Sequence, residues 1–152
     1  MPTQTRLADF IPYQMSVATN VVSDLVARQY RNTYGLKIPE WRVMAALGDS
    51  GARTQRELVQ ATRMDKVAVN RACKVLEERA LVQRSPNARD GRSHHLELTE
   101  AGLEMHSRIM PHALEMEARI LAPLSEAERK QFVSLLTRIE ASAEALEEGM
   151  SK

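Results

Sequence analysis

The 152-residue sequence is 43% hydrophobic and 27% charged, a composition typical of a soluble globular domain with a real core. No apolar run approaches the roughly 18 residues that a membrane span needs, and no signal-peptide pattern opens the chain, so we expect a cytoplasmic protein without a membrane partner. A single cysteine excludes an internal disulfide framework.

The net charge of +1 is distributed unevenly. Residues 53–95 carry ten basic and five acidic side chains, whereas residues 96–152 carry six and eleven. Because a phosphate backbone attracts clustered Lys and Arg, the middle of the chain is the part expected to meet nucleic acid.

The first expected element is a long helix over residues 7–34. Apolar residues recur at spacings of three and four from Leu7 to Tyr30, which is the helical period. Pro12 is expected to interrupt this helix near its start, and Gly35 to end it.

Two shorter helices follow. Pro39 favours the start of the first, which is expected to end in a turn over residues 48–51. Thr54 and Glu57 have the capping-box spacing that opens the second. Asp65 then caps a fourth helix after a tight turn, which gives the layout of a helix-turn-helix.

The fourth helix, over residues 65–79, is the expected recognition helix. Its apolar residues recur at helical spacing and form one stripe: Val69, Ala72, Cys73 and Leu76. The opposite face is polar and positive: Lys66, Val67, Asn70, Arg71 and Lys74. Such a helix suits a DNA groove, although a solvated amphipathic helix has the same pattern.

Two strands and two long helices complete the chain. Residues 80–85 and 94–98 have strand patterns around turn residues, which predicts a two-stranded wing. A fifth helix starts at Thr99, and Pro111 is expected to kink or divide it. Ser125 and Glu128 form a second capping box, opening a last helix through about Leu146.

The expected fold is therefore mainly α with a small two-stranded β wing. The winged unit, residues 36–98, cannot alone cover the apolar stripes of the remaining helices. We expect residues 1–35 and 99–152 to be dimerisation helices of a homodimer, within one compact domain spanning 1–150. An ordinary intramolecular helix bundle is the alternative.

An ordered set of short motifs resembles the MarR family of bacterial transcription regulators over nearly the whole chain. The motifs are Thr54-Gln-Arg-Glu-Leu58, Met64-Asp-Lys-Val-Ala-Val-Asn-Arg71, Leu76-Glu77, Leu81-Val82-Gln-Arg84, Asp90-Gly-Arg92 and Leu98-Thr-Glu-Ala-Gly102. The resemblance implies a winged helix-turn-helix homodimer on a pseudo-palindromic operator, usually a repressor released by a small ligand or an oxidant.

The chain departs from the family pattern at two places. Ala80 stands where the family usually has Gly before Leu-Val, so the turn there must avoid a positive φ or accept strain. The wing reads Asp90-Gly91-Arg92 where Asp-Arg-Arg is common, and Arg89 supplies a second positive charge beside it.

The DNA-contact residues are expected in three groups. Those for the major groove are Lys66, Val67, Ala68, Asn70, Arg71 and Lys74, because Asn pairs with adenine, Arg with guanine, and small apolar side chains with a thymine methyl. Arg92 is expected in the minor groove, with Asp90 orienting a guanidinium and Arg89 nearby. Thr54, Gln55 and Arg84 are expected to contact the backbone. Solvated hairpin charges are the alternative for the wing.

For a small-molecule effector, the resemblance points to the cleft between the dimerisation helices and the winged unit. The candidates are Ser16, Asn20, Trp41, Arg42 and Met44. Arg42 would hold an anion against an apolar wall, whereas Trp41 and Met44 are alternatively core residues. The stretch GLKIPEWRV is similar to relatives that answer to aromatic acids or their coenzyme A thioesters.

Other chemistry is not indicated. Cys73 lies in the apolar stripe, so we expect a core residue rather than a peroxide sensor. No histidine spacing suits zinc, and no phosphate-binding glycine loop is present, so no cofactor, metal or catalytic residue is expected. The leading hypothesis is a DNA-binding repressor, and the alternative is a helical protein-interaction module that kept the winged fold.

Overall fold

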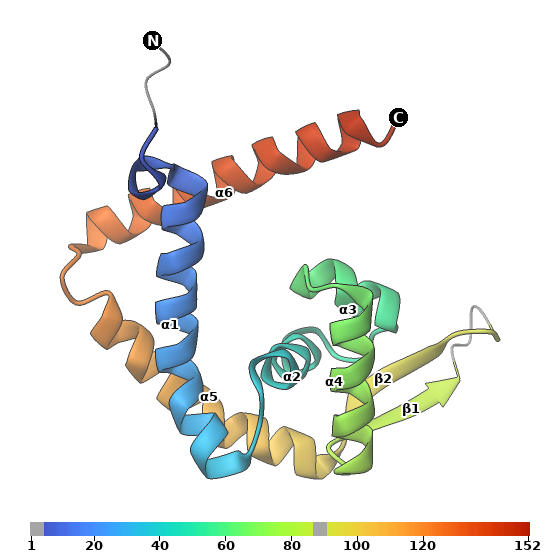
Figure 1. Cartoon of the computed structure of the whole chain (residues 1–152). Helices are drawn as coiled ribbons and strands as arrows, with labels where there is room; N and C mark the ends of the chain where they lie inside the picture. The colour runs from blue at the N-terminus through green and yellow to red at the C-terminus, as the bar shows by residue number, and fades with distance from the viewer. Residues whose placement is uncertain (1–4, 87–90) are drawn as a thin grey trace. The chain divides into compact units, whose positions relative to one another are not determined.

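The computed structural model describes residues 5–86 and 91–152. Its elements in chain order are η1 (Leu7–Asp9, a short 3-10 helix), α1 (Ile11–Tyr34), α2 (Ile38–Ser50), α3 (Gln55–Thr62), α4 (Lys66–Glu78), β1 (Val82–Pro86), β2 (His94–Leu98), α5 (Glu100–Ile120) and α6 (Glu126–Met150) (Figure 1). The chain divides into two compact units, residues 1–116 and 117–152. The dimerisation roles expected before residue 36 and after residue 98 remain predictions.

The wing is a two-stranded antiparallel sheet, as the sequence predicted. Its register runs from Val82 opposite Leu98 to Pro86 opposite His94. Arg53 forms an isolated antiparallel bridge with Leu96 of β2. Its backbone N–H donates to Leu96 O at 2.9 Å, and its carbonyl oxygen accepts the N–H of Leu96 at 2.7 Å. This bridge ties the chain just before α3 to the wing.

The expected helix boundaries are largely confirmed. Thr54 accepts the N–H of Glu57 at 3.1 Å, and Asp65 accepts the N–H of Ala68 at 2.8 Å. Ser125 and Glu128 form a complete capping box at the start of α6. Gly35 ends α1 with φ of 65°, a left-handed conformation that costs glycine little.

Two boundary predictions are wrong. The turn predicted over residues 48–51 is absent, since α2 continues through Ser50, and Gly48 instead leaves room for α5. A Cβ atom on Gly48 would lie 2.5 Å from His106 Nε2. The last helix, expected to end at about Leu146, extends to Met150. Of the two outcomes expected at Pro111, a kink or a division, the division does not occur, because α5 continues through it to Ile120. A proline removes only one helical hydrogen bond, so the packing of buried Ile109 can hold the helix together.

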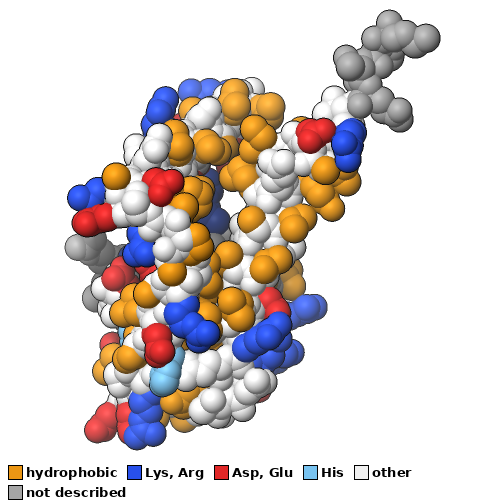
Figure 2. All heavy atoms as spheres, turned by 90° about the vertical axis from the view of Figure 1, so that its left-hand side faces the viewer, with side chains coloured by type: hydrophobic (Ala, Val, Ile, Leu, Met, Phe, Trp, Pro, Cys, Tyr) orange, Lys and Arg blue, Asp and Glu red, His pale blue; other side chains and the backbone are white. Residues whose placement is uncertain are grey.

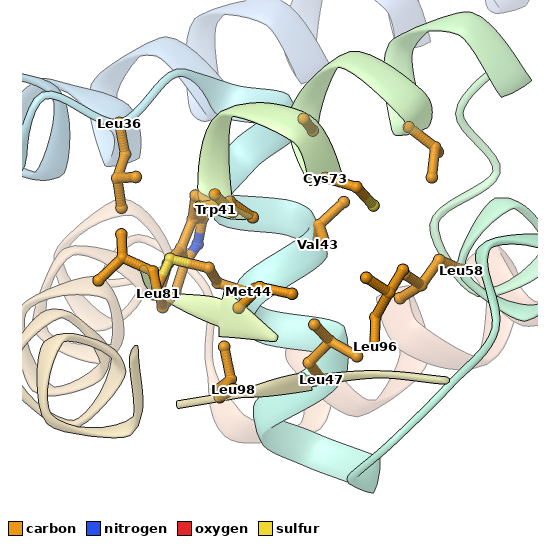
Figure 3. Packing of buried hydrophobic residues seen from close by; sticks show 14 of the residues in the cluster. Leu36, Trp41, Val43, Met44, Leu47, Leu58, Cys73, Leu81, Leu96 and Leu98 are labelled. Atoms are coloured by element: carbon orange, nitrogen blue, oxygen red, sulfur yellow. The ribbon is translucent and has the colours of Figure 1, made fainter. Parts of the chain in front are cut away.

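The core is a single apolar cluster within the first unit (Figure 3). Leu36, Val43, Leu58 and Leu96 have no exposed surface. They come from the loop before α2, from α2, from α3 and from β2, so one core holds the helices and the wing together.

An aromatic stack extends this core toward α1 and α5. The ring of Trp41 lies 5.5 Å from the ring of Tyr30 and 5.5 Å from that of His106. Burial lowers the pKa of His106 and raises that of Tyr30, because both charged forms lose solvation. The stack therefore connects α1, α2 and α5.

Apolar side chains also lie exposed on the helices outside the core. On η1, α1 and the residue between them they are Leu7, Phe10, Ile11, Tyr13, Met15, Val17, Val21 and Val22, and on α6 they are Phe132, Val133, Leu135, Leu136, Ile139, Leu146 and Met150. Figure 2 shows hydrophobic side chains along the helix that follows the grey N-terminal residues. Within the described residues, no helix is both long and apolar enough to cross a membrane.

Candidate nucleic-acid interface

The polar face of α4 is exposed as the sequence predicted. Lys66, Asn70, Arg71 and Lys74 are exposed, and Val67 keeps 59% of its surface accessible. Ala68 is half-buried. All four residues of the opposite stripe are buried: Val69, Ala72, Cys73 and Leu76. One face of α4 is thus held by the core while the other presents donors and small apolar groups to solvent.

Both ends of α4 are fixed by specific contacts. At its start, Arg63 adopts a left-handed conformation (φ of 55°) that reverses the chain between α3 and the cap residue Asp65. At its end, the Arg79 guanidinium donates to the carbonyl oxygens of Tyr34 and Gly35, at 2.7 and 3.3 Å. These contacts set the direction of the helix relative to α1 and α3.

Of the two alternatives expected for the residue after Arg79, avoiding a positive φ or accepting strain, the structure shows the second. Ala80 has φ of 56°, and its N–H still closes a turn onto Glu77 O at 2.9 Å. A left-handed conformation costs a residue with a Cβ roughly 1–2 kcal/mol. The turn after α4 therefore forms with alanine in a left-handed conformation, and the strain lowers the stability of the fold.

A groove of about 370 Å³ lies between the start of α3 and the wing. Its lining residues are Thr54, Gln55, Arg56, Arg84, Arg92, Ser93 and His94. The structure thus brings together Thr54, Gln55, Arg84 and Arg92, four of the expected DNA contacts. The other two wing candidates, Arg89 and Asp90, lie outside the described residues.

Arg84 has an intramolecular partner that the sequence did not indicate. Its Nε donates to Oε1 of Glu77, an acceptor on the last turns of α4. Seven residues and a change from helix to strand separate the two, so no local spacing rule predicts the pair. Arg84 thereby connects the wing to α4 as well as lining the groove.

The effector candidates fall into two sets. Met44 is completely buried in the core, and Trp41 keeps only 8% of its surface. Ser16 and Asn20 are exposed on the first half of α1, where the Ser16 hydroxyl donates to Pro12 O at 3.1 Å. Arg42 is exposed and donates to the hydroxyl of Ser23 at 3.4 Å. The structure therefore places only Arg42 of the α2 candidates where a ligand could reach it directly.

Cys73 is a core residue. It is fully buried, and burial raises the pKa of its thiol to about 11, far above neutrality. A thiol of that kind reacts slowly with oxidants, because the thiolate is the nucleophile. In the described part of the chain, no three His, Cys, Asp or Glu side chains are grouped to hold a metal ion.

Sequence reasoning missed Arg56, Ser93 and His94 among the groove residues. Arg56 follows the predicted cap and could have been noticed from its charge. His94 could not, because its position opposite Pro86 depends on the strand register.

A model of the MarR family matches residues 34–93. This range covers α2 to α4 and β1, together with the residues from there to Ser93. It thus includes the exposed face of α4 and six of the seven groove residues.

Individual proteins agree with this match. Over 96 residues the chain is 33% identical to the transcriptional repressor NicR of Pseudomonas putida, an alignment covering 63% of this chain and 61% of that relative. The chain thus spans about three fifths of the length of NicR.

Solved structures match more of the chain. A probable transcriptional regulator from Pseudomonas aeruginosa is 30% identical with a TM-score of 0.75, covering 88% of this chain and 99% of that one. BpsR of Bordetella bronchiseptica, whose DNA binding is regulated by 6-hydroxynicotinic acid, is 25% identical with a TM-score of 0.76, covering 86% and 98%.

Proposed function

This chain belongs to the MarR family of transcriptional regulators, and we propose that it is a ligand-released repressor that binds a pseudo-palindromic operator as a homodimer. The single observation that carries the proposal is the exposed face of α4, where Asn70, Arg71 and Lys74 stand on a helix whose other face is fully buried.

The side chains of α4 suit the major groove. Asn70 can pair with adenine and Arg71 with guanine through two hydrogen bonds each, and Val67 can contact a thymine methyl. Lys66 and Lys74 add positive charge for the flanking phosphates. The face therefore combines groups that specify a sequence with groups that position the helix.

A homodimer accounts for the exposed apolar side chains outside the core. Ile11 and Val21 on α1, Phe10 just before it, and Phe132 and Ile139 on α6 remain 47–65% exposed in the single chain. This exposure costs free energy unless a partner covers them. A two-fold dimer would also present two copies of α4 to DNA, and such proteins bind half-sites about one helical turn apart.

The effector that we propose is an aromatic carboxylate or its coenzyme A thioester. Arg42 is an exposed cation on α2 that donates to the Ser23 hydroxyl. A guanidinium can bind the carboxylate of an aromatic acid through two parallel hydrogen bonds. The regulation of BpsR by 6-hydroxynicotinic acid supports this class of ligand.

The proposal is tested by titrating the purified protein against labelled DNA from upstream of its own gene, at two salt concentrations. A scrambled duplex of the same composition is the control. We expect tight, salt-sensitive and sequence-dependent binding by a dimer. A panel of aromatic acids and aryl-coenzyme A thioesters is then added, and one member is expected to weaken binding.

Two outcomes would contradict the proposal. Equal affinity for the operator fragment and the scrambled duplex would remove the operator function and favour a protein-interaction module. If the protein is a monomer at the concentrations used for binding, the proposed homodimer is contradicted.

A further inference from the structure

The groove between α3 and the wing concentrates positive charge. Three of its seven lining residues are arginines, Arg56 from α3, Arg84 from β1 and Arg92 from the residues before β2, and an imidazole, that of His94, lies with them. Neither Arg56 nor His94 belongs to the contacts expected from the sequence. Arg56 and His94 lie outside α4, so DNA contacts made by α4 do not explain why these two side chains line the groove.

Three carboxylates lie near the groove without lining it, and one of them is paired with a groove arginine. Glu77 on α4 holds Arg84, and Glu97 on β2 accepts a hydrogen bond from Gln83 at 3.0 Å. Glu57, in the first turn of α3, accepts a hydrogen bond from the Thr54 hydroxyl at 3.2 Å. No acidic residue is among the described residues that line the groove. An anion entering it would meet the guanidinium groups first.

We propose that this groove binds a phosphate of the DNA backbone through Arg56 and His94, and that His94 does so in its protonated form. Operator binding then takes up a proton at each groove. The inference deepens the proposed function and rests on it, because the phosphate belongs to the DNA that α4 reads.

The chemistry of the lining favours a phosphodiester. A guanidinium offers paired donors that match two phosphate oxygens, and an imidazolium adds a further charge-assisted hydrogen bond. Histidine changes its charge between about pH 5 and 8, unlike the arginines around it. The phosphate stabilises the charged imidazole, so the affinity for DNA must increase as the pH falls through this range.

The wing provides a matched control for the experiment. His95 follows His94 in the same strand, and successive residues of a strand point to opposite faces. His95 does not line the groove. His94→Gln and His95→Gln thus remove the same titratable group from neighbouring positions.

The test measures DNA affinity by fluorescence anisotropy at pH 6.0 and pH 7.5, with ionic strength fixed. For the natural protein we expect binding about fivefold tighter at pH 6.0, a coupling of ordinary size. His95→Gln should keep this ratio, whereas His94→Gln should bring it close to one. An unchanged ratio in His94→Gln would overturn the role of His94.

A salt titration tests Arg56. The slope of log affinity against log salt decreases by on the order of one for each lost phosphate contact, and so by about two for a dimer. Arg56→Gln should show this decrease, and Arg28→Gln, an exposed arginine on α1, should not. If the slope for Arg56→Gln equals the slope for Arg28→Gln, Arg56 does not contact a phosphate.

The outcomes separate the inference from the proposed function. If the natural protein does not prefer its operator fragment, the proposed function fails and the inference fails with it. If the natural protein binds normally and both groove variants behave like their controls, only the phosphate site is overturned.

Discussion

Arg79 Nη2 donates a hydrogen bond of 2.7 Å to the carbonyl oxygen of Tyr34, and so joins the end of α4 to the last turn of α1. A second donor of the same guanidinium reaches Gly35 O at 3.3 Å. Forty-five residues separate Arg79 from Tyr34. The contact satisfies carbonyl groups that a helix leaves unpaired at its C-terminus.

Arg79→Met should lower the free energy of unfolding by about 1 kcal/mol, since exposed carbonyls regain water after the hydrogen bonds are lost. Urea denaturation measures the change. The control is Arg28→Met, which removes an exposed guanidinium 3.9 Å from Asp24 and should cost less than about 0.5 kcal/mol. Equal effects of the two substitutions would show that the Arg79 contacts add nothing to stability.

The strained turn at Ala80 predicts a stabilising substitution. Because φ is 56° there, Ala80→Gly should raise the free energy of unfolding by about 0.5–1 kcal/mol, the relief of Cβ strain minus the greater unfolded-state entropy of glycine. Ala101→Gly, in the exposed first turn of α5, should instead lower it by about 0.5–1 kcal/mol. A decrease for both would mean that the turn is not strained.

Gly102 packs against the backbone of the turn before β1. A Cβ atom at Gly102 would lie 2.1 Å from Leu81 O, which already accepts the N–H of Thr99 at 3.0 Å. Gly102→Ala must push α5 away from the wing, and should lower the free energy of unfolding by about 1–3 kcal/mol.

The control for this substitution is Gly149→Ala in α6, where the added methyl group meets no atom within 4 Å. It should leave the free energy of unfolding equal or slightly higher, because alanine favours a helix. Thermal denaturation of the two variants gives the comparison. A Tm for Gly102→Ala equal to that of the natural protein would contradict the close packing.

The sequence was sufficient for the parts of the fold that depend on local chemistry. The alternation of Val69, Cys73 and Leu76 with Asn70 and Lys74 identified both faces of α4, because a helix repeats every 3.6 residues whatever surrounds it. Side-chain caps were predictable for the same reason, since each joins residues three apart.

The remaining features depend on contacts between distant segments. The sequence predicts a turn at Gly48 because glycine often ends helices, but the approach of His106 from α5 explains its presence inside α2. The bridge between Arg53 and Leu96 and the pair of Glu77 with Arg84 likewise require the folded chain. The sequence predicts only some of the residues that line the groove, because strand register decides which residues face it.

The aromatic stack predicts how stability depends on pH. Burial lowers the pKa of His106, so the unfolded chain binds a proton below about pH 6.5 before the folded chain does. The free energy of unfolding should therefore decrease as the pH falls from 6.5 through the lower folded-state pKa.

His106→Phe keeps a ring beside Trp41 and removes the titration, so its free energy of unfolding should fall less over the same range. His112→Gln, an exposed residue on the same helix, should follow the natural protein. Urea denaturation at pH 5.0, 6.0 and 7.5 measures the dependence. Parallel curves for the natural protein and His106→Phe would exclude His106 as its source.

The exposed face of α4 predicts how operator recognition is lost. Arg71→Ala and Asn70→Ala each remove a side chain that can make two hydrogen bonds to a base, and each such pair contributes about 1–3 kcal/mol of discrimination. Either variant should weaken operator binding at least about tenfold and bring it closer to binding of a scrambled duplex. Lys74→Ala should weaken binding to both duplexes to a similar degree, because a phosphate contact carries no sequence information.

These variants should leave the oligomeric state and the thermal stability of the protein unchanged, since Asn70, Arg71 and Lys74 are exposed and none belongs to the core. Size-exclusion chromatography and thermal denaturation are the controls, and Arg28→Ala on α1 is the matched loss of an exposed arginine. If Arg71→Ala and Arg28→Ala bind the operator fragment equally well, α4 does not read its sequence. The buried stripe beneath it would then serve only to hold the fold together.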